Sequence, residues 1–299
     1  MRTKKWDYWA IVGRDLAVGL VYADVGYLGL ATIWWAELES GEEGGRDVAL
    51  PFGRGLSLPD VPGTTPLRHE SPKLRMALSD DAGGTRLQVD WTEADDRPGS
   101  LDVVVDRPED HESLSVVIPW SESQFQFTTK DQARPATGVL RVGDTVRGIG
   151  HDAPAWGVLD VGRGRWPYSI NWNWAGGAGH ATTGEVVGVQ MGGKWTRGTG
   201  FTENALTVDG RLHKIGRELD WDYSWDHPMR PWRVVDPGGA IDLTLTPRFD
   251  RHERTNAVVL RNEVHQVFGT WSGTVRCEDG AALRLDGIDG FAEEARNRW

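Results

Sequence analysis

Residues 205–215 read ALTVDGRLHKI, and this stretch decides the fold class. Two runs that alternate apolar and polar side chains flank Asp209 and Gly210, a dipeptide that accepts a positive φ at both positions. Successive side chains of a strand point to opposite faces, so each run is typical of an antiparallel strand with one buried face. The stretch therefore predicts a β-hairpin.

The same period of two recurs along the chain. It is clear in residues 86–91, 124–128 and 241–246, the last of which we expect to end at Pro247. Only GFAEEARNRW, residues 290–299, predicts a short helix. Many short strands separated by glycine-rich turns predict an all-β fold, either a sandwich or a barrel, with few short helices.

Length and composition limit the classes of function. The chain has 299 residues, enough for one large or two ordinary domains, and 39% of them are hydrophobic. A junction rich in glycine, proline and aspartate at residues 147–163 predicts two domains, residues 1–155 and 156–299. The net charge of −11 argues against nucleic acid or an anionic membrane as a partner, because both attract clustered lysine and arginine.

Several other sites and locations are not expected. Cys277 is the single cysteine, so an intramolecular disulfide and a cysteine metal cluster are excluded. The sequence lacks nucleotide-binding, zinc-protease and serine-hydrolase motifs, and we expect neither a metal nor another cofactor. The basic N-terminus has no long apolar segment, and the most apolar stretch is too short to span a membrane. We therefore expect a cytoplasmic protein without stable membrane insertion.

Tryptophans and amides alternate in NWNW, residues 171–174. In a strand, Asn171 and Asn173 share one face, while Trp172 and Trp174 share the other. Amides are costly to bury unpaired, so the amide face either meets solvent or lines a cavity in which a ligand supplies hydrogen-bond partners. The 16 tryptophans of the chain fit two interpretations, a thin β core filled by large side chains and a ligand groove with aromatic walls.

Three titratable residues are candidates for acid–base chemistry. Glu203 follows a glycine-rich stretch, and an apolar wall there would raise its pKa, although a simple ion pair with Arg197 or Lys194 is the alternative. His265 and Glu263 lie two apart on one strand face and could orient each other. The alternative for His265 is a structural hydrogen bond in the wall of a barrel.

Further residues are candidate ligand contacts. Amides and hydroxyls could bind a ligand oxygen, Lys194 could bind a carbonyl or an anion, and Asp7 sits between large aromatic residues. The full candidate set for ligand binding is Tyr168, Asn171, Asn173, Trp174, Lys194, Trp195, Asn204 and Asp7. Asparagine ladders and rim lysines are also common without any ligand, so each has a purely structural alternative.

A series of motifs in a fixed order resembles a known family. The motifs are KKWDYW (residues 4–9), GRGRWPY (162–168), NWNWA (171–175), GGKWTRGTGFTEN (192–204), GRLHKI (210–215), EVHQVFG (263–269) and GFAEEARNRW (290–299). They resemble the bacterial family called domain of unknown function 2804, over essentially the whole chain. That family is similar in architecture to the carotenoid 1,2-hydratase and AttH-like proteins. The resemblance implies two lipocalin-like β-barrels and an apolar or amphipathic ligand.

Three functions fit these observations. The first is a cofactor-independent lyase-type enzyme, meaning a hydratase, isomerase or cyclase, that acts on a lipid, isoprenoid or polyketide-like compound. The second is a lipocalin-like carrier of an amphipathic small molecule, without chemistry. The third is a protein that binds or cleaves carbohydrate, which requires two carboxyl groups on either side of one groove. We expect the main site in the C-terminal half.

Overall fold

The computed structural model describes residues 3–63, 66–256 and 261–298, and every regular element in them is a β-strand. The all-β fold is thus confirmed, whereas the few short helices that we expected do not occur in these residues. Two compact units are present, Met1–Glu109 with Thr128–Arg165, and Asp110–Phe127 with Trp166–Trp299. The expected domains, residues 1–155 and 156–299, stay a prediction. The units differ from them because residues 110–127 belong to the second unit and residues 156–165 to the first.

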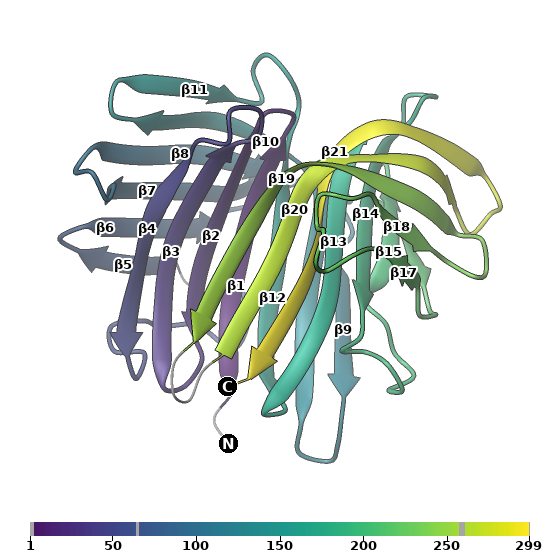
Figure 1. Ribbon diagram of the computed structural model, residues 1–299, viewed down its shortest axis with the longest axis horizontal. Coiled ribbons are helices and arrows are strands. Elements are labelled where there is room, and N and C mark those ends of the chain that lie inside the picture. Colours follow the sequence, from purple (N-terminus) through teal and green to yellow (C-terminus); the bar gives the residue numbers. More distant parts are fainter. Residues whose placement is uncertain (1–2, 64–65, 257–260, 299) are drawn as a thin grey trace. The chain divides into compact units, whose positions relative to one another are not determined.

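The first unit is built on a long curled antiparallel sheet, whose strands run in the order β4-β3-β2-β1-β12-β10-β8-β7-β6-β5 (Figure 1). Strand β10 also pairs with β9 and β11, and β9 and residues 125–127 of β10 belong to the second unit. The strands are β1 (Lys4–Gly13), β2 (Leu16–Asp24), β3 (Leu28–Glu37), β4 (Glu43–Pro51), β5 (Leu67–Ser71), β6 (Leu74–Asp80), β7 (Gly84–Thr92), β8 (Pro98–Asp106), β9 (Leu114–Pro119), β10 (Phe125–Val142), β11 (Thr145–Ile149) and β12 (Ala155–Arg165).

The second unit has a nine-stranded antiparallel sheet in the order β16-β15-β14-β13-β21-β20-β19-β18-β17. Its long strands β19, β20 and β21 lie side by side and curve together (Figure 1). The strands are β13 (Ser169–His180), β14 (Val186–Gly193), β15 (Asn204–Val208), β16 (Arg211–Ile215), β17 (Asp220–Asp222), β18 (Trp232–Val235), β19 (Ile241–Asn256), β20 (Arg261–Arg276) and β21 (Ala282–Arg298). Two curled sheets of this kind agree with two lipocalin-like barrels. No helix of the described residues is long and apolar enough to cross a membrane.

The predicted hairpin is confirmed. Strands β15 and β16 pair from Val208–Arg211 to Asn204–Ile215, and the turn residues Asp209 and Gly210 have φ values of 46° and 84°. These angles are those of a two-residue turn that matches the twist of paired strands.

Two other local predictions are wrong. Residues 290–298 continue β21 and do not form a helix, because they pair on both sides with β13 and β20. Trp299 lies outside the described residues. Pro247 does not end its strand either: β19 continues to Asn256, and the register shifts between Pro247 and Phe249. A bulge at this point accommodates a residue that has no N–H for the ladder.

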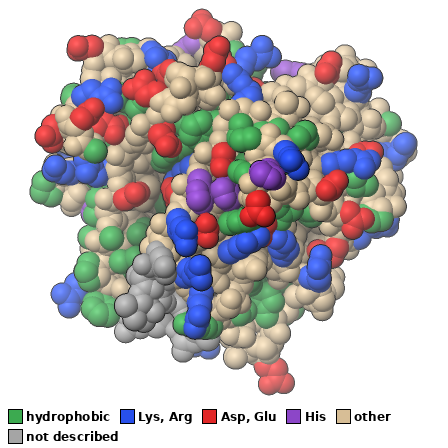
Figure 2. All heavy atoms as spheres, viewed as in Figure 1, with side chains coloured by type: hydrophobic (Ala, Val, Ile, Leu, Met, Phe, Trp, Pro, Cys, Tyr) green, Lys and Arg blue, Asp and Glu red, His purple; other side chains and the backbone are tan. Residues whose placement is uncertain are grey.

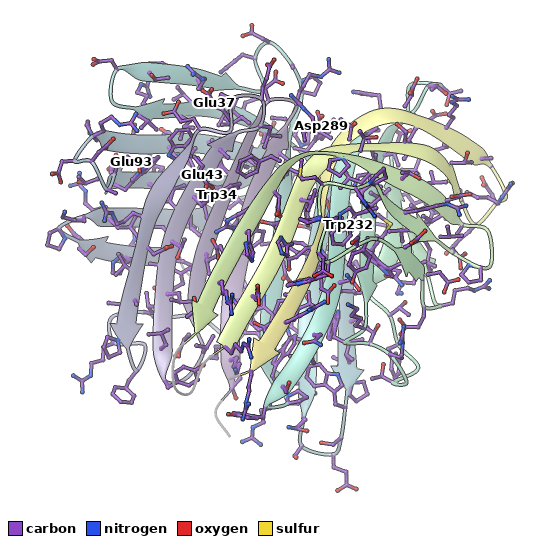
Figure 3. All side chains as sticks on the ribbon, in the orientation of Figure 1. Trp34, Glu37, Glu43, Glu93, Trp232 and Asp289 are labelled. Carbon is purple, nitrogen blue, oxygen red and sulfur yellow. The ribbon has the colours of Figure 1, made fainter. Side chains whose placement is uncertain are left out.

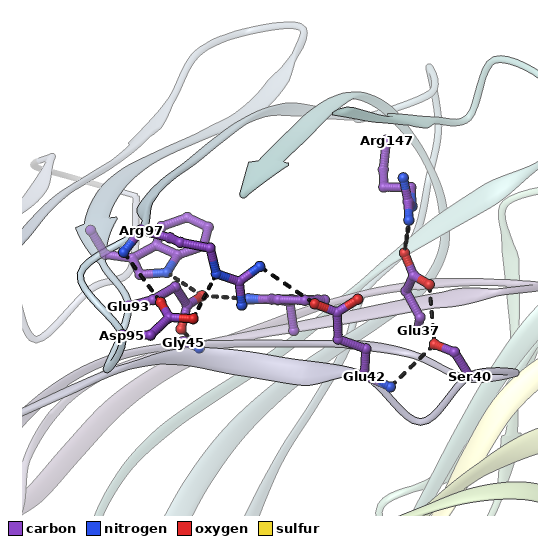
Figure 4. Close-up of polar contacts among 10 residues, drawn as sticks. Glu37, Ser40, Glu42, Gly45, Glu93, Asp95, Arg97 and Arg147 are labelled. Carbon is purple, nitrogen blue, oxygen red and sulfur yellow. Dashed lines mark hydrogen bonds and ion pairs between the residues drawn. The ribbon is translucent and has the colours of Figure 1, made fainter. Parts of the chain in front are cut away.

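Polar side chains satisfy buried groups within the apolar core of the first unit. The carboxyl group of Glu93, which is 4% exposed, accepts hydrogen bonds from the indole N–H of Trp35 at 2.7 Å, the indole N–H of Trp91 at 2.8 Å and the backbone N–H of Gly45 at 2.9 Å (Figure 4). On the neighbouring strands, the indole N–H of Trp34 donates to Glu43 (Figure 3). Glu93 is therefore a structural acceptor for three donors.

Replacing Glu93 by alanine is expected to lower the free energy of unfolding by roughly 3 kcal/mol, since three donors lose their acceptor in a dry environment. Urea unfolding monitored by circular dichroism measures the change. The control is Glu42→Ala, because Glu42 lies at the surface and pairs with Arg97 at 3.5 Å. Equal unfolding midpoints for the two variants would contradict this role of Glu93.

Candidate functional site

Cross-strand register aligns four polar side chains on the core-facing side of the second sheet. His252 lies opposite His265, His265 opposite Glu294, and Glu294 opposite Asn173, so adjacent strands β19, β20, β21 and β13 contribute one residue each. We call these four residues the polar row. One step deeper on the same face lie the buried core residues Val267, Ala292 and Ala175.

Glu294 is the centre of the polar row and is 2% exposed. It accepts hydrogen bonds from Lys194 Nζ and Arg296 Nε, both at 2.8 Å, and from the hydroxyl of Tyr223 at 2.5 Å. Burial by itself raises the pKa of this carboxyl group, but the hydrogen bonds from Arg296, Lys194 and Tyr223 outweigh it and hold the pKa below its ordinary value. Glu294 is thus a buried carboxylate whose charge is compensated by two cations.

Tyr223 covers the row from the segment after β17. Its hydroxyl donates to Glu294 and accepts from Lys194 Nζ at 2.7 Å and Asn173 Nδ2 at 3.0 Å. Its ring stacks on Trp232 with a centroid distance of 4.0 Å (Figure 3 labels Trp232). Burial and the hydrogen bond to Glu294 raise the pKa of Tyr223, so its hydroxyl stays protonated as a donor.

His265 is held in a fixed orientation while one of its ring nitrogens remains available. Its Nδ1 lies 2.8 Å from Asp250 Oδ2, which favours the tautomer with the proton on Nδ1. Within residues 3–63, 66–256 and 261–298, Nε2 of His265 has no hydrogen-bond partner. The ring stacks on His252 at 4.1 Å between centroids and meets the ring of Trp225 edge-on at 4.6 Å. Nε2 is therefore poised to exchange a proton with a ligand.

The expected pairing of Glu263 with His265 is not found. Glu263 Oε1 lies 3.3 Å from Nε2 of His252, and Asp250 takes the place beside His265. The reason is that residues two apart on one strand are about 7 Å apart, whereas Asp250 lies diagonally across β19 and β20. In the space-filling view, histidine side chains gather over β19 and β20 with acidic and basic side chains around them (Figure 2).

Four other candidates lie away from the polar row. Glu203 is 1% exposed and packs over Gly192, on the opposite face of the sheet from Asn173, where it accepts the indole N–H of Trp195 at 2.6 Å. Trp174 faces the same way and donates to Gln190. The amide of Asn204 accepts the N–H of Gly192 and donates to the carbonyl of Arg217. These hydrogen bonds lie within the second unit and do not involve the polar row.

The remaining candidates lie at the edge of the site or outside it. Asn171 shares the face of Asn173 but is exposed, and Tyr168 is exposed and accepts a hydrogen bond from Arg298 Nε at 3.2 Å. Asp7 belongs to the first unit and pairs with Arg163 at 2.8 Å. Burial raises the pKa of Asp7, and Arg163 opposes that effect. Asp7 is therefore a structural ion pair of the first unit.

The polar row forms a layer above a packed interior. Beneath it, buried apolar side chains including Trp232 and Trp271 make up the core. An open groove of about 810 Å³ occurs in the first unit, between β5, β6, β7, β8 and β10, with Arg75, Asp90 and Arg141 in its lining. Among the described residues, no three His, Cys, Asp or Glu side chains are grouped so that they could hold a metal ion.

The sequence analysis missed Asp250, His252, Tyr223, Trp225, Glu294 and Arg296. Two of them were hidden by the helix predicted for residues 290–299. Read as a strand, AEEARNR places Glu294 and Arg296 on one face, and that face is the one of His265 and Asn173. Tyr223 and Trp225 lie in the loop after β17, and Asp250 and His252 lie in a part of β19 where every residue from 250 to 256 is polar, so the period of two gives no signal.

The chain is similar to one known protein family and to solved structures. A family model described as "Domain of unknown function (DUF2804)" matches residues 1–299. The crystal structure of CghA is similar at 11% identity with a TM-score of 0.50, over 99% of this chain and 88% of that chain. Kievitone hydratase from Nectria haematococca is similar at 10% identity with a TM-score of 0.49, over 98% of this chain and 88% of that chain. A comparison with curated proteins found no match.

Proposed function

Since the chain belongs to the domain of unknown function 2804 family, whose description names no reaction, we propose its function from the polar row. The protein is a cofactor-independent lyase-type enzyme, a hydratase or isomerase, that acts on an amphipathic small molecule such as a lipid, isoprenoid or polyketide-like compound. The observation that carries this proposal is His265, whose Nδ1 is held by Asp250 while Nε2 makes no hydrogen bond to the described residues, beside the Glu294 network.

His265 acts as the general acid–base group. In the neutral ring, the carboxyl group of Asp250 fixes the proton on Nδ1 and leaves a lone pair on Nε2. After it accepts a proton, the imidazolium is stabilised by the same carboxyl group. A histidine placed in this way contributes rate factors on the order of 10²–10⁴ in known enzymes.

The acid–base strength of an imidazole favours an enolate-type reaction at this site. Glu294 compensates the charges of Lys194 and Arg296, and the guanidinium of Arg296 lies 3.6 Å from the ring centroid of Trp225, so it covers that aromatic face. An imidazolium is too weak an acid to protonate an isolated alkene, whereas a neutral imidazole can remove a proton next to a carbonyl group. The site therefore supports removal of a proton from a carbon next to a carbonyl group, in place of direct protonation of an isolated alkene.

The reaction balances without an external reagent. Nε2 of His265 takes the proton from the carbon next to the carbonyl, and the C–H electron pair forms the enolate. The enolate then forms the C=C bond as the neighbouring hydroxyl leaves, taking the proton from the imidazolium, so that water and an unsaturated carbonyl compound are the products. The reverse sequence hydrates the same double bond, and return of the proton to another carbon gives isomerisation.

Deuterium exchange tests this proposal. The purified protein is incubated in D₂O with a small-molecule extract of its source cells, and mass spectrometry follows deuterium in each compound. We expect at least one carbonyl compound to gain deuterium with the wild type and not with His265→Gln. A carrier would instead co-purify with an intact ligand and leave every compound unlabelled, and that result would replace the enzyme by the carrier.

A further inference from the structure

We infer that the substrate of this site carries an anionic group, a carboxylate or a phosphate, which is bound by arginines on β19, β20 and β21 beyond the polar row. This inference deepens the proposed function and rests on the same site. It identifies the substrate as an acidic amphipathic molecule whose acid group is separate from the reacting carbonyl.

Strand register places four arginines on the face of the polar row. One step outward from His252, His265 and Glu294 lie Arg254, Glu263 and Arg296. One step further, Arg261 lies opposite Arg298. We call Arg254, Arg261, Arg296 and Arg298 the arginine rim. Basic side chains lie close to the histidines on this face (Figure 2). This concentration of positive charge is notable in a chain of net charge −11.

The rim arginines keep most of their donors available. Arg296 uses only Nε for Glu294, Arg298 uses only Nε for Tyr168, and Arg254 Nε approaches Glu263 at 4.0 Å. In the part of the chain that the structure describes, the terminal amino groups of these three arginines have no hydrogen-bond partner, and Arg261 has no partner at all. A guanidinium binds carboxylate or phosphate through two parallel N–H groups, so the rim offers several unused binding forks.

The spacing of the rows fixes where the anionic group lies. Two residues along a strand span about 7 Å, so the rim extends from about 7 Å to about 14 Å from the His265 level. Arg296 reaches back to Glu294 through its Nε, so Arg254, Arg261 and Arg298 are the rim members that hold an acid group away from Nε2. An acid group bound by these three is separated from the carbon at Nε2 by a chain of about five bonds.

Binding of matched probes tests the inference. Octanoate, octyl phosphate and octanol share one alkyl chain and differ in the head group, and isothermal titration measures their dissociation constants at low salt. We expect octanoate, octyl phosphate or both to bind at least about tenfold more tightly than octanol. The preferred anion identifies the acid group. The preference should weaken with added salt, because rim charges are screened.

Paired variants locate the binding site. Arg254→Gln/Arg298→Gln should reduce the anion preference about tenfold. The control Arg284→Gln, which removes an exposed arginine from the same strand β21, should leave it unchanged. Octanol binding as tightly as both anions, no saturable binding of any probe, or equal loss in the control would overturn the inference. Deuterium exchange that depends on His265 would still stand in each of those cases, so the two proposals fail separately.

Discussion

His265→Gln is expected to lower kcat/KM for the deuterium-exchanging substrate roughly 10³-fold, with little change in the unfolding midpoint. Glutamine can occupy the space of the ring but cannot shuttle a proton at neutral pH. The loss should appear in kcat, because the proton transfer takes place in the transition state and binding of the substrate is retained. Mass spectrometry of deuterium incorporation in samples quenched at successive times, at several substrate concentrations, gives kcat and KM.

The matched control for this variant is His180→Gln. His180 is exposed on β13, and its Nδ1 contacts the carbonyl of Gly184. We expect the deuterium exchange rate of His180→Gln to match that of the wild type. Asp250→Asn provides a second test, because an asparagine amide that donates to Nδ1 forces the proton to Nε2. A loss of about 10² or more is expected for Asp250→Asn, and wild-type rates in either site variant would contradict the role of His265.

Glu294→Gln is expected to lower the free energy of unfolding by roughly 2–3 kcal/mol at pH 7, because the partly exposed Lys194 and Arg296 lose the carboxylate that accepts their hydrogen bonds. Urea unfolding monitored by tryptophan fluorescence measures the difference. Glu253→Gln is the control, since the side chain of Glu253 is half exposed on β19. Its free energy of unfolding should change by less than about 1 kcal/mol.

The contribution of Glu294 to the free energy of unfolding should depend on pH, and the pKa shift of Glu294 sets the sign of that dependence. Burial raises the pKa of Glu294, but its hydrogen bonds lower it further, so the folded-state pKa lies below the ordinary value of 4.5. The unfolded state therefore binds the proton first, and the contribution of Glu294 to stability is complete above about pH 5. It is lost as the pH falls through 4.5 towards the folded-state pKa. The difference between wild type and Glu294→Gln should shrink between pH 6 and pH 3, and a constant difference would be inconsistent with this charge network.

Alternation in the sequence was sufficient to predict the all-β fold class and part of the candidate site. The hairpin at residues 205–215 and the two faces of residues 171–174 follow directly from the period of two, since turn chemistry and side-chain direction are local properties. His265, Asn173 and Lys194 were found because they lie in or next to strands with clear alternation.

The rest of the candidate site could not be predicted, because it depends on the register between strands that are distant in the sequence. Nothing local shows that His265 lies opposite Glu294, or that Asp250 is the residue beside its Nδ1. The glutamates and arginines of residues 293–298 also have high helix propensity, and pairing with two neighbouring strands overrides that propensity. Glu203 as a proton donor remains a prediction from the sequence, on the face of the sheet opposite to the polar row.

Tryptophan signals offer the most direct test of the claim that substrate binds at the polar row. The chain has 16 tryptophans, and the indole N–H resonances of ¹⁵N-tryptophan-labelled protein can be assigned by single substitutions. Addition of the deuterium-exchanging compound should shift the resonance of Trp225, which contacts His265, and leave Trp35 and Trp91 of the first unit unchanged. Shifts confined to Trp35 and Trp91, with Trp225 unaffected, would place the ligand in the first unit and contradict the site.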